Sequence, residues 1–231
     1  MVGVIQRSDS DGLVSERARL RMVEQLAHQG IDSELVLGAM KKVPRHLFVE
    51  QGLASRAYED VALPIGHGQT ISRPSTVARM LWLLAESVRP QEVRKLRALE
   101  IGTGCGYQAT VMARLFADVV SVERVHWLHE LAKVNVRPFR LPNLRLIFGD
   151  GTAGVTAGAP YDVVISAAAS ESISKDWLRQ MAVGGRLVAP VKAPDSDVQT
   201  LHVVDRVSPD EWSLTVLDPV RFVPLRAGVA R

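Results

Sequence analysis

Three glycines at alternate positions are the residues of this chain best suited to holding a ligand. Gly102, Gly104 and Gly106 follow an apolar run and precede a stretch of helical character, in ALEIGTGCGYQATVMARL. Because glycine has no Cβ, such a loop turns sharply and lets its backbone approach a bound molecule closely. In an open parallel sheet this turn lies at the carboxyl end of a strand, where ligands bind. The alternative is a plain strand-to-helix turn.

Acidic residues near the ends of three successive predicted strands narrow the choice of ligand. Glu100 lies two residues before the first glycine, Glu123 ends the next strand, and Asp150 ends the third, followed by Gly151. A dinucleotide fingerprint requires glycine at position 107, where this chain has Tyr107. An acid beside a pyrophosphate would also repel it, whereas a cationic ligand would tolerate Glu100. Taken alone, each acid is more often a helix cap or a solvated strand end.

The Glu-x-Gly-x-Gly-x-Gly pattern, followed by a strand-end acid, resembles the signature of class I S-adenosylmethionine-dependent methyltransferases. S-adenosylmethionine carries a sulfonium and an ammonium, and the resemblance places Thr103 against it with the three glycines. Glu123 is placed to accept hydrogen bonds from two ribose hydroxyls, and Asp150 with Gly151 is expected at the adenine edge. We therefore expect S-adenosylmethionine as the cofactor and S-adenosylhomocysteine as its product.

The elements that must position these residues alternate from residue 97 onward. Apolar runs ending in polar or glycine residues alternate with helical stretches, which predicts a parallel sheet covered on both faces. Two apolar runs near the end of the chain, separated by Ser208-Pro209-Asp210-Glu211, predict an antiparallel pair. The expected fold is α/β, with a doubly wound, mostly parallel, Rossmann-like sheet. The predicted strands are 98–102, 118–123, 144–150, 162–167, 186–191, 200–207 and 212–225.

The first 96 residues predict a helical addition to this sheet. An apolar stripe predicts a helix over 13–30. Asp32 is expected to cap a second helix, and Pro74 to open a third after a connection rich in proline and glycine. The expected divisions are a flexible head, 1–12, and a single domain, 13–231, made of a substrate-site part, 13–96, and the cofactor-binding sheet, 97–231.

Several segments, in order along the chain, together resemble the protein-L-isoaspartate O-methyltransferase family, which repairs isomerised aspartyl residues. LPIGHGQTIS is the most specific of them. The resemblance implies methyl transfer to the α-carboxylate of L-isoaspartyl residues in damaged proteins and peptides. The ester would cyclise to a succinimide, whose hydrolysis returns some normal aspartate. The segments are VPRHLFV (43–49), YEDVALPIGHGQTIS (58–72) with Pro74, EIGTGCGYQ (100–108), SVER (121–124), GDG (149–151) and PVRFVPL (219–225).

The same resemblance assigns site residues in the first half of the chain. It implies that Gln69, Thr70 and Ile71 lie over the cofactor and acceptor site, with Ser72 at the active position. The rival interpretation of Ser72 is an N-cap for the helix that follows it. Gln199 is a further candidate on the cofactor side, by the same analogy.

A carboxylate acceptor requires little chemistry from the protein. Its pKa lies near 4, so it is ionised at neutral pH and needs no general base. The enzyme need only align oxygen, methyl and sulfur and exclude water, and the hydroxyls of Thr70 and Ser72 could hold the acceptor oxygens. His67 is therefore expected to have a positioning role in its loop, and Cys105 to be a small filler.

Three departures from the family pattern concern only the peptide. Arg73 stands where the family commonly has glutamine and would favour acidic peptides. The fourth strand has its hydroxyl at Ser166 and alanine at Ala167, and a shift of one residue moves a side chain to the opposite face. Lys192 stands where glycine is usual and is expected to alter the loop over the peptide groove.

Net charge, cysteine content and the length of apolar runs favour some classes of protein over others. The 231 residues, 25.3 kDa, carry a formal charge of +3, which demands no nucleic-acid partner. The one cysteine excludes an intramolecular disulfide, and no apolar run is long enough to span a bilayer. The start does not resemble a secretory signal. His126 and His129 favour a solvated helix face over a metal pair, so no metal is expected. We expect a cytoplasmic monomer that binds neither nucleic acid nor membrane.

Four alternatives stay open at this point. The same cofactor could serve another peptide or small-molecule carboxylate, which rates on isoaspartyl and aspartyl peptides would distinguish. Nucleic-acid methylation is disfavoured because no Asn/Asp-Pro-Pro-Tyr motif follows the fourth predicted strand. An NAD-dependent oxidoreductase is disfavoured by Tyr107 and Glu100, and a non-enzymatic module would bind the cofactor without turnover.

Overall fold

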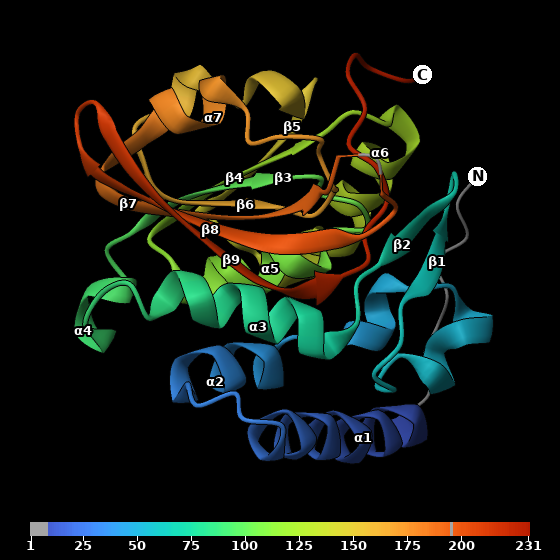
Figure 1. Ribbon diagram of the computed structural model, residues 1–231. Coiled ribbons are helices and arrows are strands. Elements are labelled where there is room, and N and C mark those ends of the chain that lie inside the picture. The colour runs from blue at the N-terminus through green and yellow to red at the C-terminus, as the bar shows by residue number, and fades with distance from the viewer. Residues whose placement is uncertain (1–8, 195) are drawn as a thin grey trace.

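A seven-stranded sheet forms the centre of the computed structural model, which describes residues 9–194 and 196–231 (Figure 1). The strand order is β5-β4-β3-β6-β7-β8-β9. The strands from β5 to β7 run parallel, and β8 and β9 add to the sheet as an antiparallel pair, which confirms the expected architecture. The bounds are β3 (Arg97–Ile101), β4 (Asp118–Glu123), β5 (Leu144–Phe148), β6 (Tyr161–Ser166), β7 (Met181–Lys192), β8 (Gln199–Ser208) and β9 (Glu211–Val220).

The chain reverses its direction of travel across the sheet at β3. It moves outward from β3 through β4 to β5, and then returns to place β6 on the other side of β3. The carboxyl ends of β3 and β6 therefore border the switch point, where open α/β sheets bind ligands. The connecting elements are α5 (Tyr107–Leu115), α6 (His126–Val136), η3 (Arg137–Phe139), η4 (Gly151–Ala153), η5 (Thr156–Gly158) and α7 (Lys175–Gln180).

Two apolar clusters cover the two faces of the sheet. Strand residues alternate between them, so that Ala98 packs into one cluster and Leu99 into the other. The larger cluster joins the sheet to α5 and to the N-terminal helices, and the smaller one packs Trp177 of α7 against the opposite face. This alternation is the period-2 pattern expected of strands buried on both faces.

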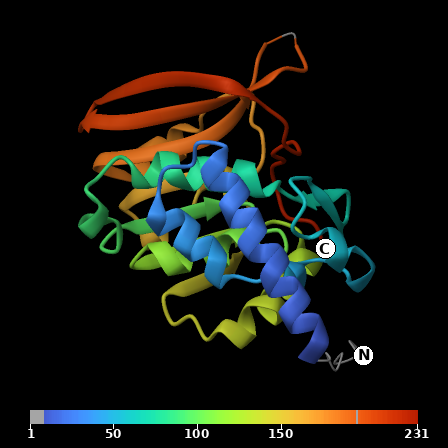
Figure 2. The same cartoon turned by 90° about the horizontal axis from the view of Figure 1, so that it is seen from below.

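The N-terminal helices stack below the sheet as an extra layer (Figures 1 and 2). The helix expected from residue 13 begins at Asp9, and residues 1–8 of the expected head lie outside the described residues. The second helix is capped by Ser33 rather than Asp32: Ser33 has extended backbone angles, and its Oγ accepts a hydrogen bond from Val36 N. The elements are α1 (Asp9–His28), α2 (Glu34–Lys42), η1 (Arg45–Phe48), η2 (Gln51–Arg56), α3 (Pro74–Ala85) and α4 (Pro90–Val93).

A short hairpin projects from this layer beside the carboxyl end of the sheet (Figure 1). Its strands are β1 (Leu63–Gly66) and β2 (Gln69–Ile71), paired antiparallel. The tip residue His67 has a φ of +51°, and its ring lies 5.1 Å from the Trp127 ring on α6. The contact holds the hairpin next to the first turns of α6.

Within the described residues, no helix combines the length and the apolar character needed to cross a bilayer.

Candidate active site

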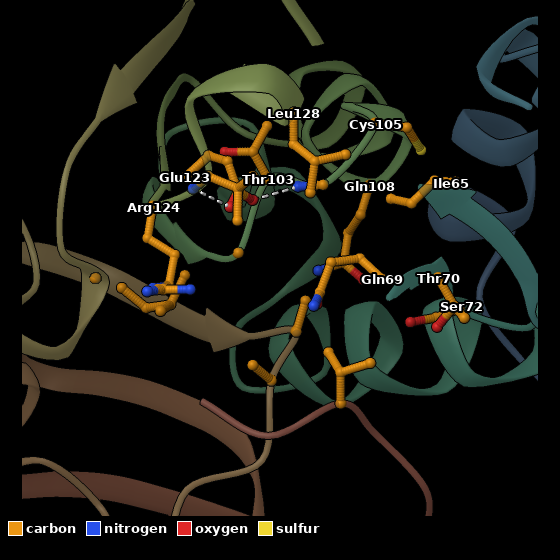
Figure 3. A pocket seen from close by; sticks show the side chains of 18 of the residues that line it. Ile65, Gln69, Thr70, Ser72, Thr103, Cys105, Gln108, Glu123, Arg124 and Leu128 are labelled. Carbon is orange, nitrogen blue, oxygen red and sulfur yellow. Dashed lines mark hydrogen bonds between the residues drawn. The ribbon is translucent and has the colours of Figure 1, made fainter. Parts of the chain in front are cut away.

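A pocket lies at the carboxyl ends of β3, β4 and β6, the edge at which open α/β sheets bind small molecules. Three parts of the chain surround it: the glycine loop with the end of β4, the β1–β2 hairpin, and a segment near the C-terminus. Figure 3 shows Glu123 and Thr103 on one side of the pocket, and Gln69, Thr70 and Ser72 on the other.

The glycine loop adopts backbone angles that favour glycine. Gly104 has a φ of +55° and Gly106 a φ of +88°, both in the left-handed region. A Cβ on Gly104 would lie 3.2 Å from Ile65 Cδ1 of the hairpin, and one on Gly106 would lie 3.0 Å from Val136 of α6. The glycines therefore permit the hairpin and α6 to close tightly on the loop.

Glu123 fastens this loop from the end of β4. Its Oε2 accepts a hydrogen bond from Gly104 N at 2.8 Å, and its Oε1 accepts one from Val125 N at 2.9 Å. The carboxylate lines the pocket although the residue is only 5% exposed. Each carboxylate oxygen can accept more than one hydrogen bond, so these contacts leave acceptor capacity for a ligand.

Glu100 lies beneath the loop and does not line the pocket. Its side chain is fully buried and hydrogen-bonded through Oε2 to Ser121 Oγ at 2.5 Å. Ser121 Oγ in turn lies 2.6 Å from Thr103 Oγ1. Burial raises the pKa of Glu100 to about 8, although the hydrogen bonds of Ser121 and Gln108 act against this.

The hairpin supplies the residues that the resemblance placed at the acceptor site. Gln69, Thr70, Ile71 and Ser72 all line the pocket. The rival interpretation of Ser72 as a helix cap is wrong, because the N-cap position of α3 is the following residue.

The first turn of α3 is instead capped from outside the helix. Asp60 Oδ1 accepts a hydrogen bond from Ser75 N at 2.8 Å. Asp60 thus satisfies one of the free N–H groups that every helix start leaves. Ser72 faces the pocket without having to serve the helix.

A buried arginine, Arg45, contacts both the segment that precedes the hairpin and the residue that follows the glycine loop. Arg45 Nε donates to Ala57 O at 2.8 Å, and its guanidinium lies 5.1 Å from the centre of the Tyr107 ring. Burial lowers the pKa of Arg45, but the carbonyls of Ala57 and Val61 and the aromatic face stabilise its charge. Tyr107 is the first residue of α5 and directly follows the glycine loop. The contact with Arg45 therefore connects the segment before β1 to that loop.

The segment Val223–Arg226, which we call the C-terminal strap, closes the pocket on its third side. Sequence reasoning predicted a strand over 212–225, but β9 ends at Val220. The strap instead exchanges backbone hydrogen bonds with Ala169, which follows β6: Ala169 N donates to Val223 O, and Leu225 N donates to Ala169 O.

Asp150 and Arg124 hold the chain just beyond the strap. Asp150 Oδ2 accepts a hydrogen bond from Gly228 N at 2.6 Å, while Arg124 Nε donates to Gly228 O at 2.8 Å. Asp150 also accepts from Thr152 N and Thr152 Oγ1. Burial alone would raise the pKa of Asp150, but these hydrogen bonds lower it. Asp150 does not line the pocket, whereas Gly151 does.

Gln199 also holds the strap rather than lining the pocket. Its amide donates to Phe222 O at 3.1 Å and accepts from Phe222 N at 2.6 Å, next to the start of the strap. A matched pair of hydrogen bonds of this kind fixes the backbone of the residue it holds. Gln199, which was suggested to lie on the cofactor side, therefore contacts the residue before the strap and does not itself line the pocket.

Of the twelve site residues expected from the sequence, the structure brings nine to the pocket and leaves three outside it. The nine that line it are Gln69, Thr70, Ile71, Ser72, Gly102, Thr103, Gly104, Glu123 and Gly151, and the three outside it are Glu100, Gly106 and Asp150. Sequence reasoning missed the strap, together with Arg124 directly after β4 and Leu128 in the first turn of α6. PVRFVPL was recognised as a family segment, and that signal could have marked the strap.

Two other residues considered in the sequence, Cys105 and His129, are buried. Cys105 is buried, and burial raises the pKa of its thiol to about 11, in keeping with a filler. His129 is only 8% exposed and packs near Phe148, so the expected solvated face is wrong at that residue. No three His, Cys, Asp or Glu side chains among residues 9–194 and 196–231 gather as a metal site would require.

The three departures from the family pattern differ in their distance from the pocket. Ala167 lines it, while the buried hydroxyl of Ser166 donates to Ala168 O at 2.8 Å, in agreement with the predicted change of face. Arg73 is exposed and does not line the pocket. Lys192 lies 3.1 Å from Asp197 in an ion pair.

Replacement of Asp150 by alanine is expected to loosen the strap. It removes the acceptor for Gly228 N and leaves the chain beyond Arg226 held by fewer contacts. Trypsin should then cleave after Arg226 several times faster than in the parent, as followed by mass spectrometry. Asp210→Ala, an exposed acid in the β8–β9 turn, is the control. Equal cleavage rates in all three proteins would show that Asp150 does not hold the strap.

Comparison with known proteins places this architecture in one family. The sequence profile described as Protein-L-isoaspartate(D-aspartate) O-methyltransferase matches residues 17–230. Curated proteins named protein-L-isoaspartate O-methyltransferase from Burkholderia ambifaria and Burkholderia mallei are each 54% identical over 217 residues, 94% of this chain. The chain spans 68% and 66% of their respective lengths, about two thirds.

Solved structures agree in fold. A protein-L-isoaspartate O-methyltransferase matches 92% of this chain, and 67% of its own, with a TM-score of 0.81 at 28% identity. A Plasmodium falciparum protein assigned to the same enzyme class, solved with S-adenosyl-L-homocysteine, matches 90% of this chain and 98% of its own with a TM-score of 0.78 at 22% identity. The chain belongs to the protein-L-isoaspartate(D-aspartate) O-methyltransferase family.

Proposed function

We propose that this chain transfers a methyl group from S-adenosylmethionine to the α-carboxylate of L-isoaspartyl residues in damaged proteins and peptides. The observation that carries the proposal is the pocket itself. It joins the glycine loop and Glu123, which suit the cofactor, to the hydroxyl-bearing hairpin residues Thr70 and Ser72. Family membership supports the same reaction, since the relatives that cover this chain carry that name.

The residues present fit S-adenosylmethionine. Gly102 and Gly104 of the loop leave the pocket wall without Cβ atoms, and Gly151 belongs to the same wall. The Glu123 carboxylate offers acceptors for ribose hydroxyls, as acids at this position do in related sites. Gln108 also lines the pocket, next to the glycine loop, and its side chain interacts with the buried Glu100 carboxyl. When bound, the cofactor supplies a methyl group activated by its sulfonium.

The chain's own residues need only position the acceptor and keep water out. A carboxylate is ionised at neutral pH, so no side chain has to remove a proton. The hydroxyls of Thr70 and Ser72 are donors placed to hold carboxylate oxygens. The hairpin and the strap cover the pocket from two sides, which reduces the water that could compete with the acceptor.

Ser72→Ala should lower turnover about tenfold, the effect of one lost hydrogen bond to a charged acceptor. The Kd of the cofactor should change by less than threefold, because Glu123 and the glycine loop are left intact. Initial rates and calorimetry measure the two effects separately. Ser75→Ala is the matched control, because that residue contributes its backbone N–H to Asp60. Unchanged turnover in Ser72→Ala would remove Ser72 from the acceptor site.

Complete repair tests the proposed reaction. The methyl ester should cyclise to a succinimide, and hydrolysis of the succinimide should return part of the peptide as normal aspartate. An isoaspartyl peptide incubated with the protein and excess S-adenosylmethionine should therefore accumulate the aspartyl peptide over repeated rounds, as resolved by chromatography. An isoaspartyl peptide that stays unmethylated while a different carboxylate compound is methylated would assign the same pocket another acceptor.

We further propose that the enzyme acts in the cytoplasm as a monomer on damaged proteins, without nucleic acid or membrane. In support, the formal charge is only +3, which gives no general attraction to nucleic acid or anionic membranes. A lone, buried cysteine is in keeping with a reducing compartment. In this proposal residues 13–96 present the acceptor, residues 97–231 bind the cofactor, and both parts belong to a single domain.

A further inference from the structure

Three polar side chains form a continuous path from the interior of the sheet to the pocket. Glu100 of β3 and Ser121 of β4 are paired in register and project from the same face of the sheet. Glu100 Oε2 lies 2.5 Å from Ser121 Oγ, which lies 2.6 Å from Thr103 Oγ1. Glu100 and Ser121 are fully buried, and among the three only Thr103 lines the pocket.

Counting protons leaves two arrangements that differ at the pocket, because a proton on Oε1 of Glu100 would leave Ser121 and Thr103 oriented as in the ionised form. Each hydroxyl has a single proton, and an ionised carboxylate has none. If Glu100 is ionised, Ser121 donates to it, Thr103 donates to Ser121, and Thr103 offers only lone pairs to the pocket. If Glu100 is protonated on Oε2, it donates to Ser121, Ser121 donates to Thr103, and the Thr103 proton is free for a ligand.

We propose that Glu100, Ser121 and Thr103 act as a polar relay, in which the proton on Glu100 makes Thr103 a hydrogen-bond donor to the cofactor. Glu100 is thus a positioning residue that acts through the other two. The inference deepens the proposed function and rests on it, because the ligand of the relay is S-adenosylmethionine or its product. Both carry a carboxylate, which is an acceptor that a Thr103 donor would bind.

The surroundings of Glu100 favour the protonated arrangement at neutral pH. Its burial raises its pKa to about 8, and the neighbouring carboxylate of Glu123 on β4 raises it further. The hydrogen bonds of Ser121 and of Gln108 on α5 act in the opposite direction. The β6 residue paired with Glu100 is the apolar Ile165. Burial of an ionised carboxylate is costly unless a cation pairs with it, and the described groups with the largest effects on Glu100 include no cation.

Other titrating groups near the loop do not change charge in the same range. The pKa of the Cys105 thiol is raised to about 11 and that of the Tyr107 hydroxyl to about 12, in both cases chiefly by burial. The ligand's own α-amino group has an ordinary pKa of about 8 and does titrate there. A useful experiment must therefore compare two proteins with the same ligand.

The test is the Kd of S-adenosylhomocysteine, measured by calorimetry between pH 6.5 and 9.5 for the full chain and for Glu100→Gln. A glutamine amide keeps a donor for Ser121 at every pH, so it holds the relay in the donating arrangement. The two curves should converge near pH 6.5. The parent should bind about tenfold more weakly than Glu100→Gln at pH 9.5. Titration of the ligand cancels in the ratio.

Thr103→Val provides a second, nearly isosteric variant that leaves Glu100 and Ser121 in place. It removes the donor at the pocket, so the parent should lose its advantage over Thr103→Val as the pH rises from 6.5 to 9.5. This comparison decides the matter even if Glu100→Gln fails to fold, which far-ultraviolet circular dichroism would reveal. Ratios that stay constant with pH would overturn the relay and leave the proposed function standing. A parent chain that does not bind S-adenosylhomocysteine at all would overturn both.

Discussion

Glu123→Ala should weaken the binding of S-adenosylhomocysteine by roughly 10- to 100-fold, the cost of losing a charged acceptor for bound hydroxyls. A second effect acts in the same direction. The substitution also removes the acceptors for Gly104 N and Val125 N, so the glycine loop loses its attachment to the end of β4. A loop that must be ordered by the ligand binds it less tightly.

Calorimetric titration of the folded variant measures this loss, and two further variants interpret it. Glu123→Gln keeps the size of the side chain but places an NH₂ group near one backbone donor, so its affinity should lie between those of Glu123→Ala and the parent. Glu130→Ala removes an exposed acid of α6 that is paired with Lys133, and should bind as the parent does. Equal affinity in Glu123→Ala and the parent would refute the assignment of Glu123 to the cofactor.

Glu100→Gln should change the pH dependence of stability. In the folded chain burial raises the pKa of Glu100 to about 8, whereas the group has its ordinary value of 4.5 when exposed. Above pH 4.5 the unfolded chain releases a proton that the folded chain keeps. The stability that the neutral carboxyl contributes is therefore complete below pH 4.5 and is lost progressively as the pH rises to about 8.

The loss corresponds to about 1.4 kcal/mol for each pH unit, or on the order of 4 kcal/mol between pH 5 and pH 8. Urea unfolding at the two pH values should show that difference in the parent relative to Glu100→Gln, which cannot titrate. Glu130→Gln is the control at an exposed acid whose pKa is lowered, so it should behave like the parent over this range. Parallel pH profiles for Glu100→Gln and the parent would show that Glu100 is ionised in the folded chain.

The sheet was largely predictable because its strands are apolar runs bounded by polar residues. The expected strand 118–123 coincides with β4, and the turn at 208–211 joins β8 to β9 as expected. The hairpin was not found, because its strands span only four and three residues around Gly-His-Gly, too short for a periodic pattern. The segment 221–225 resembles a strand, but its backbone forms hydrogen bonds with the backbone of Ala169 and not with that of β8.

The candidate site was predictable where contacts are local and less so where they are distant. The glycine loop and Glu123 meet because neighbouring parallel strands end at the same edge of the sheet. Asp150 ends at the same edge, but a backbone N–H 78 residues away, at Gly228, binds its carboxylate. Glu100 alternates with Leu99 and Ile101, so strand periodicity turns it under α5 rather than into the pocket.

The most direct test of the central claim is methyl transfer from labelled S-adenosylmethionine to paired peptides that differ only in isoaspartate versus aspartate at one position. We predict rapid labelling of the isoaspartyl peptide and little or none of the aspartyl peptide, with the label released by mild base as expected for a methyl ester. Equal labelling of both peptides, or cofactor binding with transfer to neither, would contradict the claim that this pocket serves isoaspartyl repair.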